Sequence, residues 1–398
     1  MVRNKSIIIL VASMFLVSSG YTMVIPFLPL YLGQLGVPSE ELSLWTGFVF
    51  SICFFIAAVM GPLWGKLADT DGKKKMAVRA AILLGFSYLF CGLCQNQYHL
   101  LAARAFQGFA NGFVAAAMAI ISDNAEPGKL GVTLGMAQTS LVVGGILGPL
   151  MGGALSHAIG MRNTFFLSAA FLWAVALTVI FFVSEIKKGL PPEMRKSTSI
   201  SQDLIYAWEN HDLRGLLFIT CLLQTTILMI QPVTAIYVGN IMNHSGNIEL
   251  AAGIIMSSGG IAGALTTTLW GKFGQSKGYY RAIFVTLGAA GVLTIIQSFP
   301  NTIWGFGLCQ FLVGCFVIGV NPSLNAALVK YSPSDFRGRI FGLSNMAQQF
   351  GNMTGPLVSA AVSMSLGIWE VYVFAGMIQL SAACVIYFKR VRSPLQNK

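Results

Sequence analysis

Charged residues are scarce in this sequence. Asp, Glu, Lys and Arg make up only 10% of its 398 residues, whereas 55% of the residues are hydrophobic. A soluble domain carries about 25% charged residues, so this chain has too few to cover a water-exposed surface. The mean hydropathy of +0.71 agrees with this. The scarcity of charge excludes an ordinary soluble protein and indicates that lipid surrounds much of the chain.

Several patterns that carry chemistry are also missing. No G-x-x-x-x-G-K-[ST] loop is present, so ATP is not expected to supply the energy, and no acid–base cluster or nucleophile triad is visible. The seven cysteines lie inside apolar runs, including the pair Cys91 and Cys94, and are expected to be buried small hydrophobes. We therefore expect no enzyme, no cofactor and no metal. A receptor or scaffold would need a soluble sensing domain, and no segment is long enough to form one.

The chain contains instead a series of long apolar runs. A membrane-spanning helix needs about 20 mainly apolar residues, and the first run is too long for a signal peptide. The longest polar segment, 185–212, follows the sixth run and is interpreted as a cytoplasmic linker. We predict an all-α membrane protein with twelve transmembrane helices in two pseudo-symmetric bundles, 1–184 and 213–398. The predicted helices are 7–32, 44–66, 76–95, 98–122, 130–156, 163–184, 213–239, 249–271, 280–298, 301–329, 338–365 and 370–388.

The positive charges are distributed unevenly over the predicted loops. If the N-terminus is inside, all Lys and Arg except Arg104 and Arg162 fall on the inner side. This positive-inside pattern places both termini in the cytoplasm and accounts for the net charge of +11. Nucleic-acid binding is not expected, because the cytoplasmic loops are too short to build a basic surface.

The two halves repeat each other at an almost constant offset. Trp64-Gly65-Lys66 recurs 206 residues later, and Gly148-Pro149 recurs 207 residues later. A constant register over several helix pairs indicates a parallel internal repeat. Such halves pack around a central cavity and rock against each other, which is alternating access. Further matched positions are Pro26 with Pro232, Tyr31 with Tyr237, Gly72 with Gly278 and Gly108 with Gly314.

Three local patterns carry candidate functional residues. Residues 65–75 form a short loop with Gly65, Asp69 and Gly72, where glycines let helix ends approach closely, and Lys73 and Lys74 can reach Asp123 at the inner end of 98–122. Arg104 is the only charge deep inside an apolar run, where a guanidinium is costly unless paired or wet; it is either functional or snorkels to the headgroups. The third pattern consists of four-residue glycine spacings that favour tight helix contact and a proline kink: Gly144, Gly148, Pro149 and Gly152.

Together these patterns resemble the Major Facilitator Superfamily over the whole chain. The loop is similar to the signature G-x-L-a-D-r-x-G-r-k, residues 104–108 are similar to R-x-x-q-G, and residues 144–153 are similar to the antiporter motif g-x-x-x-G-P-x-x-G-G. The resemblance is to the twelve-helix drug:proton antiporter branch, in particular bacterial multidrug exporters of the MdtG and PmrA type. It implies that Asp69 faces the start of the helix near Arg337, and that the loop closes an inner gate.

No acid lies in the middle of any predicted helix, although many proton-coupled exporters keep a carboxylate there. One reading is that Asp123 or His157 titrates. The other is that Arg104 binds an anionic substrate, and the sequence leaves both open. Polar and aromatic side chains at mid-depth are candidates for the cavity lining or for contacts between helices: Tyr21, Gln107, Asn111, Gln138, Gln224, Gln231, Gln310, Asn321, Asn325, Asn345 and Gln349.

The sequence and the resemblance thus predict a monomeric secondary exporter of small amphipathic compounds in a bacterial cell membrane, driven by proton antiport. Its partners would be a small-molecule substrate, protons and membrane lipids. The alternative is an exporter of one anionic metabolite, such as a carboxylate siderophore, with Arg104 binding the anion.

Overall fold

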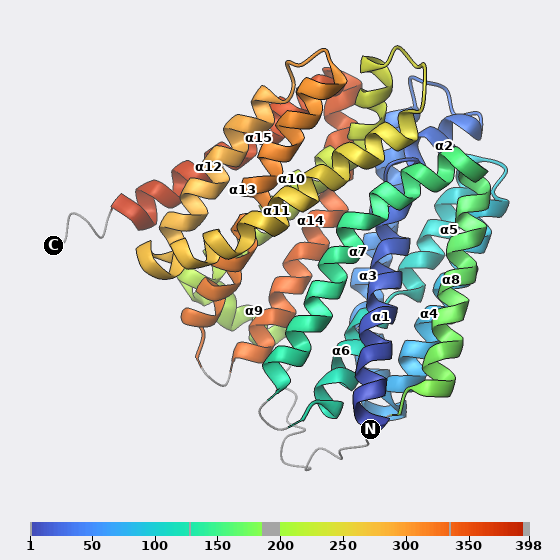
Figure 1. Ribbon diagram of the computed structural model, residues 1–398. Helices are drawn as coiled ribbons and strands as arrows, with labels where there is room; N and C mark the ends of the chain where they lie inside the picture. The colour runs from blue at the N-terminus through green and yellow to red at the C-terminus, as the bar shows by residue number, and fades with distance from the viewer. Residues whose placement is uncertain (1, 127–128, 185–199, 334–335, 393–398) are drawn as a thin grey trace. The chain divides into compact units, whose positions relative to one another are not determined.

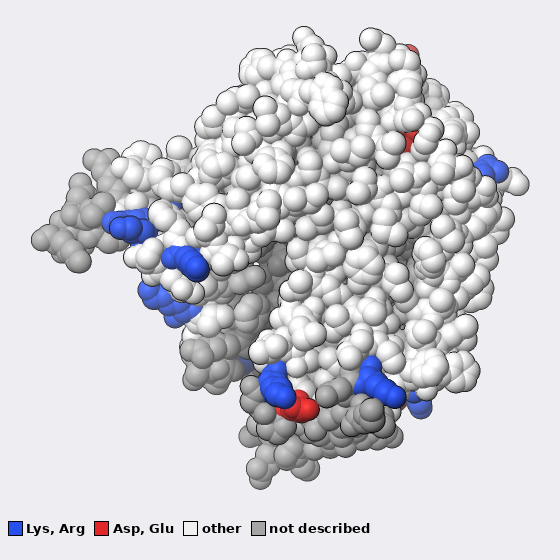
Figure 2. Space-filling model, viewed as in Figure 1, with Lys and Arg blue, Asp and Glu red and all other residues white. Residues whose placement is uncertain are grey.

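The computed structural model describes residues 2–126, 129–184, 200–333 and 336–392, and within these ranges it leaves out the side chains of residues 2–4, 69, 200–201, 337–338 and 392. All regular structure in the described ranges is helical, which confirms the predicted fold class (Figure 1). Eleven of the described helical segments are long and apolar enough to cross a membrane. Figure 2 shows a broad uncharged surface, with Lys and Arg confined to small patches.

The first half of the chain contains eight helices, coloured blue to green in Figure 1. They are α1 (Val2–Met23), α2 (Leu28–Gln34), α3 (Leu42–Asp71), α4 (Lys73–Leu93), α5 (Gln97–Ala110), α6 (Phe113–Asn124), α7 (Leu130–Ile159) and α8 (Met161–Phe182).

The second half contains seven α-helices and a short π-helix. They are α9 (Ile200–Glu209), α10 (His211–Ile241), α11 (Ile248–Lys277), α12 (Tyr279–Ile296), α13 (Ile303–Lys330), α14 (Arg337–Ser365), α15 (Ile368–Ile386) and η2 (Tyr387–Arg392).

Two predicted helices are interrupted, so their predicted continuity was wrong. The run 7–32 divides into α1 and α2 around Pro26, which has no N–H to donate, and turn hydrogen bonds such as Phe27 N to Val24 O (3.3 Å) replace helical ones there. The run 98–122 divides into α5 and α6 at Asn111–Gly112, and the two helices together form one of the eleven apolar spans, Gln97–Asn124. Gly112 has φ +120°, a conformation that strains any residue with a Cβ.

The segment predicted as a linker also differs from the expectation. Residues 200–209 form α9, whereas residues 185–199 lie outside the described part of the chain. Helix α9 is fastened to α14, because Arg339 Nη1 lies 2.8 Å from Asp203 Oδ1 and the rings of Tyr206 and Phe336 lie 4.7 Å apart. The linker therefore includes an ordered helix that packs on the second half.

Helix α14 corresponds to the predicted run 338–365, and it is absent from the eleven apolar spans. Its polar positions include Asn345, Gln349 and Asn352, which lower its apolar character. It packs along α10, and Gly351 and Gly355 lie against the α10 backbone. The helix is as long as the others, so its polarity, and not its length, sets it apart.

The chain divides into two compact units: residues 1–195 with 247–257, and residues 196–246 with 258–398. The first turns of α11 thus belong to unit 1, where Ser257 Oγ donates a 2.6 Å hydrogen bond to Ile146 O on α7. The predicted domain boundaries remain a prediction. Each unit has its own core of buried apolar side chains, such as Leu10 and Phe165 in unit 1 and Leu324 in unit 2.

The internal repeat is visible in the packing of each unit. In unit 1, α1 packs on α7, and in unit 2, α10 packs on α14. A Cβ on Gly148 would lie 2.7 Å from Ser19 O, and a Cβ on Gly355 would lie 2.5 Å from Thr225 O. Ser19 and Thr225 are themselves 206 residues apart, so the repeated glycines meet repeated backbone atoms. Close helix approach of this kind needs residues without a side chain.

Candidate functional site

Arg104 lies on α5 and points into the interior of unit 1. Helix α5 begins after Asn96, whose side chain caps it by accepting a 2.9 Å hydrogen bond from His99 N. Arg104 is only 3% exposed, so it does not lie along a lipid-facing surface as the snorkelling alternative required. Its Nε donates to Val49 O on α3 (3.3 Å), and its Nη1 donates to Gln107 Oε1 (2.5 Å).

The surroundings of Arg104 are aromatic and neutral. The guanidinium lies 5.5 Å from the ring centroid of Phe50, a favourable cation–π arrangement. Tyr21, Cys53 and Tyr88 are close enough to interact with it electrostatically. Among the described side chains, no carboxylate lies within ion-pair distance of Arg104. Arg104, Gln107 and Tyr21 therefore form one cluster, which holds a cation without a described counter-ion.

Gln107 carries a second polar group in this cluster that lacks a partner. Its side chain is 2% exposed, and its Nε2 has no hydrogen-bond partner among the described residues. A buried donor without a partner is costly, at about 1–3 kcal/mol. Gln107 thus presents a donor without a partner beside the Arg104 guanidinium, which suits an anionic or carbonyl-bearing ligand.

The helix interruption at Asn111–Gly112 has its own set of partners. Trp64 Nε1 donates a 2.9 Å hydrogen bond to Phe109 O, and Arg79 Nη2 donates a 2.8 Å bond to Asn111 O. The guanidinium of Arg79 also lies 3.5 Å from the centroid of the Trp64 ring. These donors satisfy carbonyls that the interruption removes from the helical pattern.

Arg79 was missed as a site residue because it was counted among the loop charges. It lies within α4, so Arg104 is not the only charge inside an apolar helix. The Asn111-Gly112 dipeptide, a turn signal inside an otherwise apolar run, could have marked the interruption. Among the described residues, Arg79 Nε and Nη1 have no hydrogen-bond partner.

The loop at 65–75 is a tight turn between two long helices. Gly72 has φ +108° and joins α3 directly to α4, and its repeat partner Gly278 has φ +99°. A Cβ on Gly65 would meet no atom within 4 Å, so close approach does not explain that glycine. The side chain of Asp69 lies outside the described part of the structure, and its expected contact near Arg337 stays a prediction.

The basic residues after Gly72 contact two different helices. Lys73 Nζ lies 2.5 Å from Asp123 Oδ2 at the end of α6, which is the contact expected from the sequence. Lys74 Nζ donates a 2.8 Å hydrogen bond to Ile180 O near the end of α8. Both side chains of the Lys73–Asp123 pair are about one quarter exposed. The pair joins the start of α4 to the end of α6, and its role in a gate remains a proposal.

The glycine pattern of α7 faces α1. A Cβ on Gly144 would lie 2.6 Å from Phe15 O, and a Cβ on Gly152 would overlap Met23 O. Pro149 lies inside α7 without ending the helix. The α1 side contributes hydroxyls as well, since Ser18 Oγ donates to Leu141 O at 2.7 Å. These residues are the contact surface between two helices within unit 1.

The other predicted lining residues occupy varied positions. Asn111 accepts a hydrogen bond from Gly112 N (2.7 Å) at the interruption, and Gln138 is exposed on α7. Gln310 accepts a 2.6 Å hydrogen bond from Gln297 Nε2, so it also has a structural partner. The candidates in unit 2 are partly buried or exposed: Gln224, Gln231, Gln310, Asn321 and Gln349 are partly buried, and Asn325 and Asn345 are exposed.

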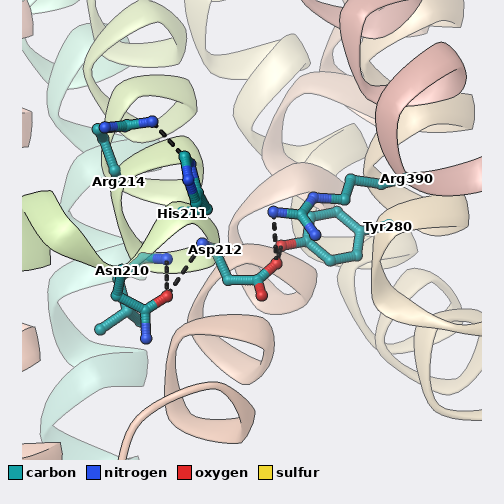
Figure 3. Close-up of polar contacts among 7 residues, drawn as sticks. Asn210, His211, Asp212, Arg214, Tyr280 and Arg390 are labelled. Atoms are coloured by element: carbon teal, nitrogen blue, oxygen red, sulfur yellow. Dashed lines mark hydrogen bonds and ion pairs between the residues drawn. The ribbon is translucent and has the colours of Figure 1, made fainter.

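A polar cluster in unit 2 was not foreseen from the sequence (Figure 3). Asp212 Oδ1 accepts hydrogen bonds from Tyr280 Oη (2.7 Å) and from Arg390 Nη2 (2.9 Å). Asn210 caps α10 by accepting from Asp212 N and Leu213 N. The cluster joins the starts of α10 and α12 to η2. Its partners are far apart in sequence, so no local pattern indicated it.

The two groups proposed to titrate lie near helix ends. Asp123 is paired with Lys73, and His157 is exposed in the last turn of α7. In the described part of the chain, no group of three or more His, Cys, Asp or Glu side chains could hold a metal ion.

Comparison with known proteins identifies the family to which the chain is similar. The family model of the Major Facilitator Superfamily matches residues 10–296 and 217–398. The chain is 34% identical over 392 residues to the multidrug resistance protein MdtG of Escherichia fergusonii, covering 98% of this chain and 94% of that protein. It is 32% identical over 381 residues to MdtG of Proteus mirabilis, covering 95% and 92%.

Solved transporter structures share the fold at low sequence identity. A bacterial homologue of the human lysosomal transporter Spinster aligns with a TM-score of 0.79 at 16% identity, covering 100% of this chain and 98% of that one. The nucleoside transporter NupG aligns with a TM-score of 0.79 at 16% identity, covering 97% and 99%. The helical fold, the family model and the full-length relatives agree: this chain is a multi-pass membrane protein that belongs to the Major Facilitator Superfamily.

Proposed function

We propose that this protein exports small amphipathic compounds by proton antiport, through alternating access of its two halves. The observation that carries the proposal is the similarity to MdtG multidrug resistance proteins over more than nine tenths of the chain. In this proposal the protein is a monomer in a bacterial cell membrane, with both termini in the cytoplasm. It is surrounded by lipids and exchanges its substrate for protons.

Within unit 1, the Arg104 cluster is the proposed binding and coupling element. Arg104 and Gln107 are buried, and the aromatic rings of Tyr21 and Phe50 lie beside them. Rings next to a few polar donors suit amphipathic molecules, because apolar contact supplies affinity and the donors orient the ligand. The Lys73–Asp123 pair is the proposed gate contact, because it joins two helix ends beside the signature loop.

A second candidate, export of an anionic metabolite such as a carboxylate siderophore, is favoured by one observation. The buried guanidinium of Arg104 has no carboxylate partner among the described residues. A substrate carboxylate would supply the missing counter-charge, and charge-assisted hydrogen bonds to arginine are among the strong ones.

Proteoliposomes with an imposed pH gradient test both candidates. The assay compares the efflux of cationic, neutral and carboxylate compounds, with and without a protonophore. Gradient-driven efflux of several cationic or neutral compounds supports multidrug antiport. Efflux of carboxylates alone supports the anion exporter, and a rate that the gradient does not change for any compound refutes antiport.

A further inference from the structure

Helix α6 is short, and a side chain of α4 contacts it at each end. At its C-terminal end, Asp123 pairs with Lys73 in the first turn of α4. At its N-terminal end, the carbonyl of Asn111 accepts a hydrogen bond from Arg79, which lies further along α4. The two helices also pack directly on each other. We expect α6 to move with α4, and hence with the signature loop that precedes α4.

Helix α5 packs on both α3 and α4, and it is hydrogen-bonded to α3. Arg104 donates to Val49 O on α3, and a Cβ on Gly108 would overlap the carbonyl oxygen of Cys53, also on α3. Helix α5 is therefore held by α3 as well as by α4, whereas α6 is held to α4 and has little contact with α3. The Asn111–Gly112 interruption lies where these two attachments meet, and it is the only peptide link between α5 and α6.

The second half supplies an internal control for this arrangement. Trp270 Nε1 donates a 2.8 Å hydrogen bond to Cys315 O, which matches the bond of Trp64 to Phe109 O at the 206-residue offset. Yet α13 runs from Ile303 to Lys330 without interruption. A tryptophan bond of this kind does not by itself break a helix.

The residues that distinguish the first half are absent together from the second half. The positions that match Arg79, Asn111 and Gly112 are Val285, Val317 and Ile318, and those that match Lys73 and Asp123 are Tyr279 and Val329. The interruption, the stacked arginine and the ion pair thus occur as a set in one half. Because these residues occur together in one half, we infer that they act together and do not merely fill space between helices.

We propose that the Asn111–Gly112 interruption is a hinge that transmits the state of the Lys73–Asp123 ion pair to the Arg104–Gln107 pair, with Arg79 and Trp64 as positioning residues. When the ion pair opens, α6 loses its link to the start of α4 and rotates about Gly112, while Arg79 holds the end near Asn111. Arg79 Nε and Nη1 have no partner among the described residues, so the guanidinium can take new carbonyl acceptors as the angle changes. The transport consequence rests on the proposed function, whereas the hinge motion does not.

The hinge motion is tested first by distance measurement on the full chain in lipid. Nitroxide labels attached through genetically encoded unnatural amino acids replace Ala102 on α5 and Ser122 on α6, which are both exposed. The Lys73→Gln substitution opens the ion pair. In an otherwise native chain we expect it to shift the mean label distance by about 2 Å or more, the scale of helix shifts in switching proteins. An unchanged distance distribution overturns the proposal.

A straightened variant is the matched control. This variant carries the matching residues of the second half: Arg79→Val, Asn111→Val and Gly112→Ile. The Arg79 substitution is included because a Cβ at position 112 would lie 3.3 Å from Arg79 Nη2. In this background we expect Lys73→Gln to shift the mean distance by less than about 1 Å, because a continuous helix moves as one body. A shift equal to that of the native hinge contradicts the proposal. If the triple variant does not fold, Arg79→Gln alone is expected to broaden the distance distribution, and an unbroadened distribution counts against the hinge.

Transport kinetics supply a second readout in proteoliposomes. We expect Arg79→Gln to lower the maximal efflux rate about tenfold and to change the half-saturating concentration less than about twofold, because the residue acts on a transition and not on binding. Arg79→Lys should restore part of the rate, and Trp270→Phe should stay within about twofold of the wild type. An equal loss in Arg79→Gln and Trp270→Phe overturns the assignment. If the wild-type protein shows no gradient-driven efflux, the proposed function fails, and the distance measurements still decide the hinge.

Discussion

Trp64 and Trp270 make the same hydrogen bond in the two halves of the chain. Each indole Nε1 donates to a backbone carbonyl 45 residues later, at 2.9 Å to Phe109 O and at 2.8 Å to Cys315 O. Gly108 and Gly314, which precede these acceptors, lie against matching backbone carbonyls, that of Cys53 on α3 and that of Gly259 on α11. The internal repeat therefore preserves tertiary contacts as well as residue identities.

Replacement of Arg104 by Lys is expected to lower efflux more than tenfold. The guanidinium donates in two directions, to Val49 O and to Gln107 Oε1, and an ammonium group cannot reproduce this planar fork. Arg162→Lys is the matched control, because Arg162 lies outside the Arg104 cluster and donates to Cys94 O (3.1 Å). Efflux by Arg104→Lys at the wild-type rate would show that charge alone is sufficient at this position.

Replacement of Gly148 by Ala is expected to destabilise unit 1 by about 1–3 kcal/mol, which is typical of overpacking. The new Cβ would lie 2.7 Å from Ser19 O on the backbone of α1, which cannot move aside as a side-chain end can. Gly135→Ala on the same helix is the control, because its Cβ meets no atom within 4 Å. Thermal unfolding in detergent should show a lower midpoint for the first variant only. Equal midpoints would contradict the packing role.

Loss of either partner in the Lys73–Asp123 pair is expected to reduce efflux roughly fivefold, or about 1 kcal/mol, the upper range for a pair of such exposure. The variants Lys73→Gln and Asp123→Asn each remove one charge. The exchanged pair, Lys73→Asp with Asp123→Lys, should regain part of the rate. Lys129→Gln is the control, since its ion pair with Glu126 is much more exposed. No recovery in the exchanged pair, with normal expression, would argue against a simple ion pair.

The Asp212 cluster is expected to stabilise unit 2. A double-mutant cycle of Asp212→Asn and Arg390→Gln, measured by thermal unfolding, should give a coupling energy of about 1 kcal/mol. Asp212 also accepts from Tyr280, so Tyr280→Phe should be less harmful in the Asp212→Asn background than alone. The exposed neighbour Lys389 provides the control through Lys389→Gln. A coupling energy near zero would show that Arg390 and Asp212 act independently.

Much of the candidate site was predictable because its residues belong to local patterns. Arg104 and Gln107 are one helical turn apart, so their meeting on one face follows from the helix period. The Lys73–Asp123 contact was expected from the family pattern and is present at 2.5 Å. By contrast, Arg79 was read as a loop charge, since nothing in its neighbourhood shows that its guanidinium stacks on Trp64.

The sequence by itself determined the membrane environment, the helical class and the two-fold repeat. These depend on composition and on the spacing of residues along the chain, and the apolar runs and matched glycines display both. Only the tertiary structure decided where the helices break and what holds each break. At Asn111–Gly112 the freed carbonyls find donors on Trp64 and Arg79, which are 32 to 45 residues away. Whether such donors arrive depends on how helices pack, because a hydrogen bond is satisfied by proximity in space and not by order in the chain.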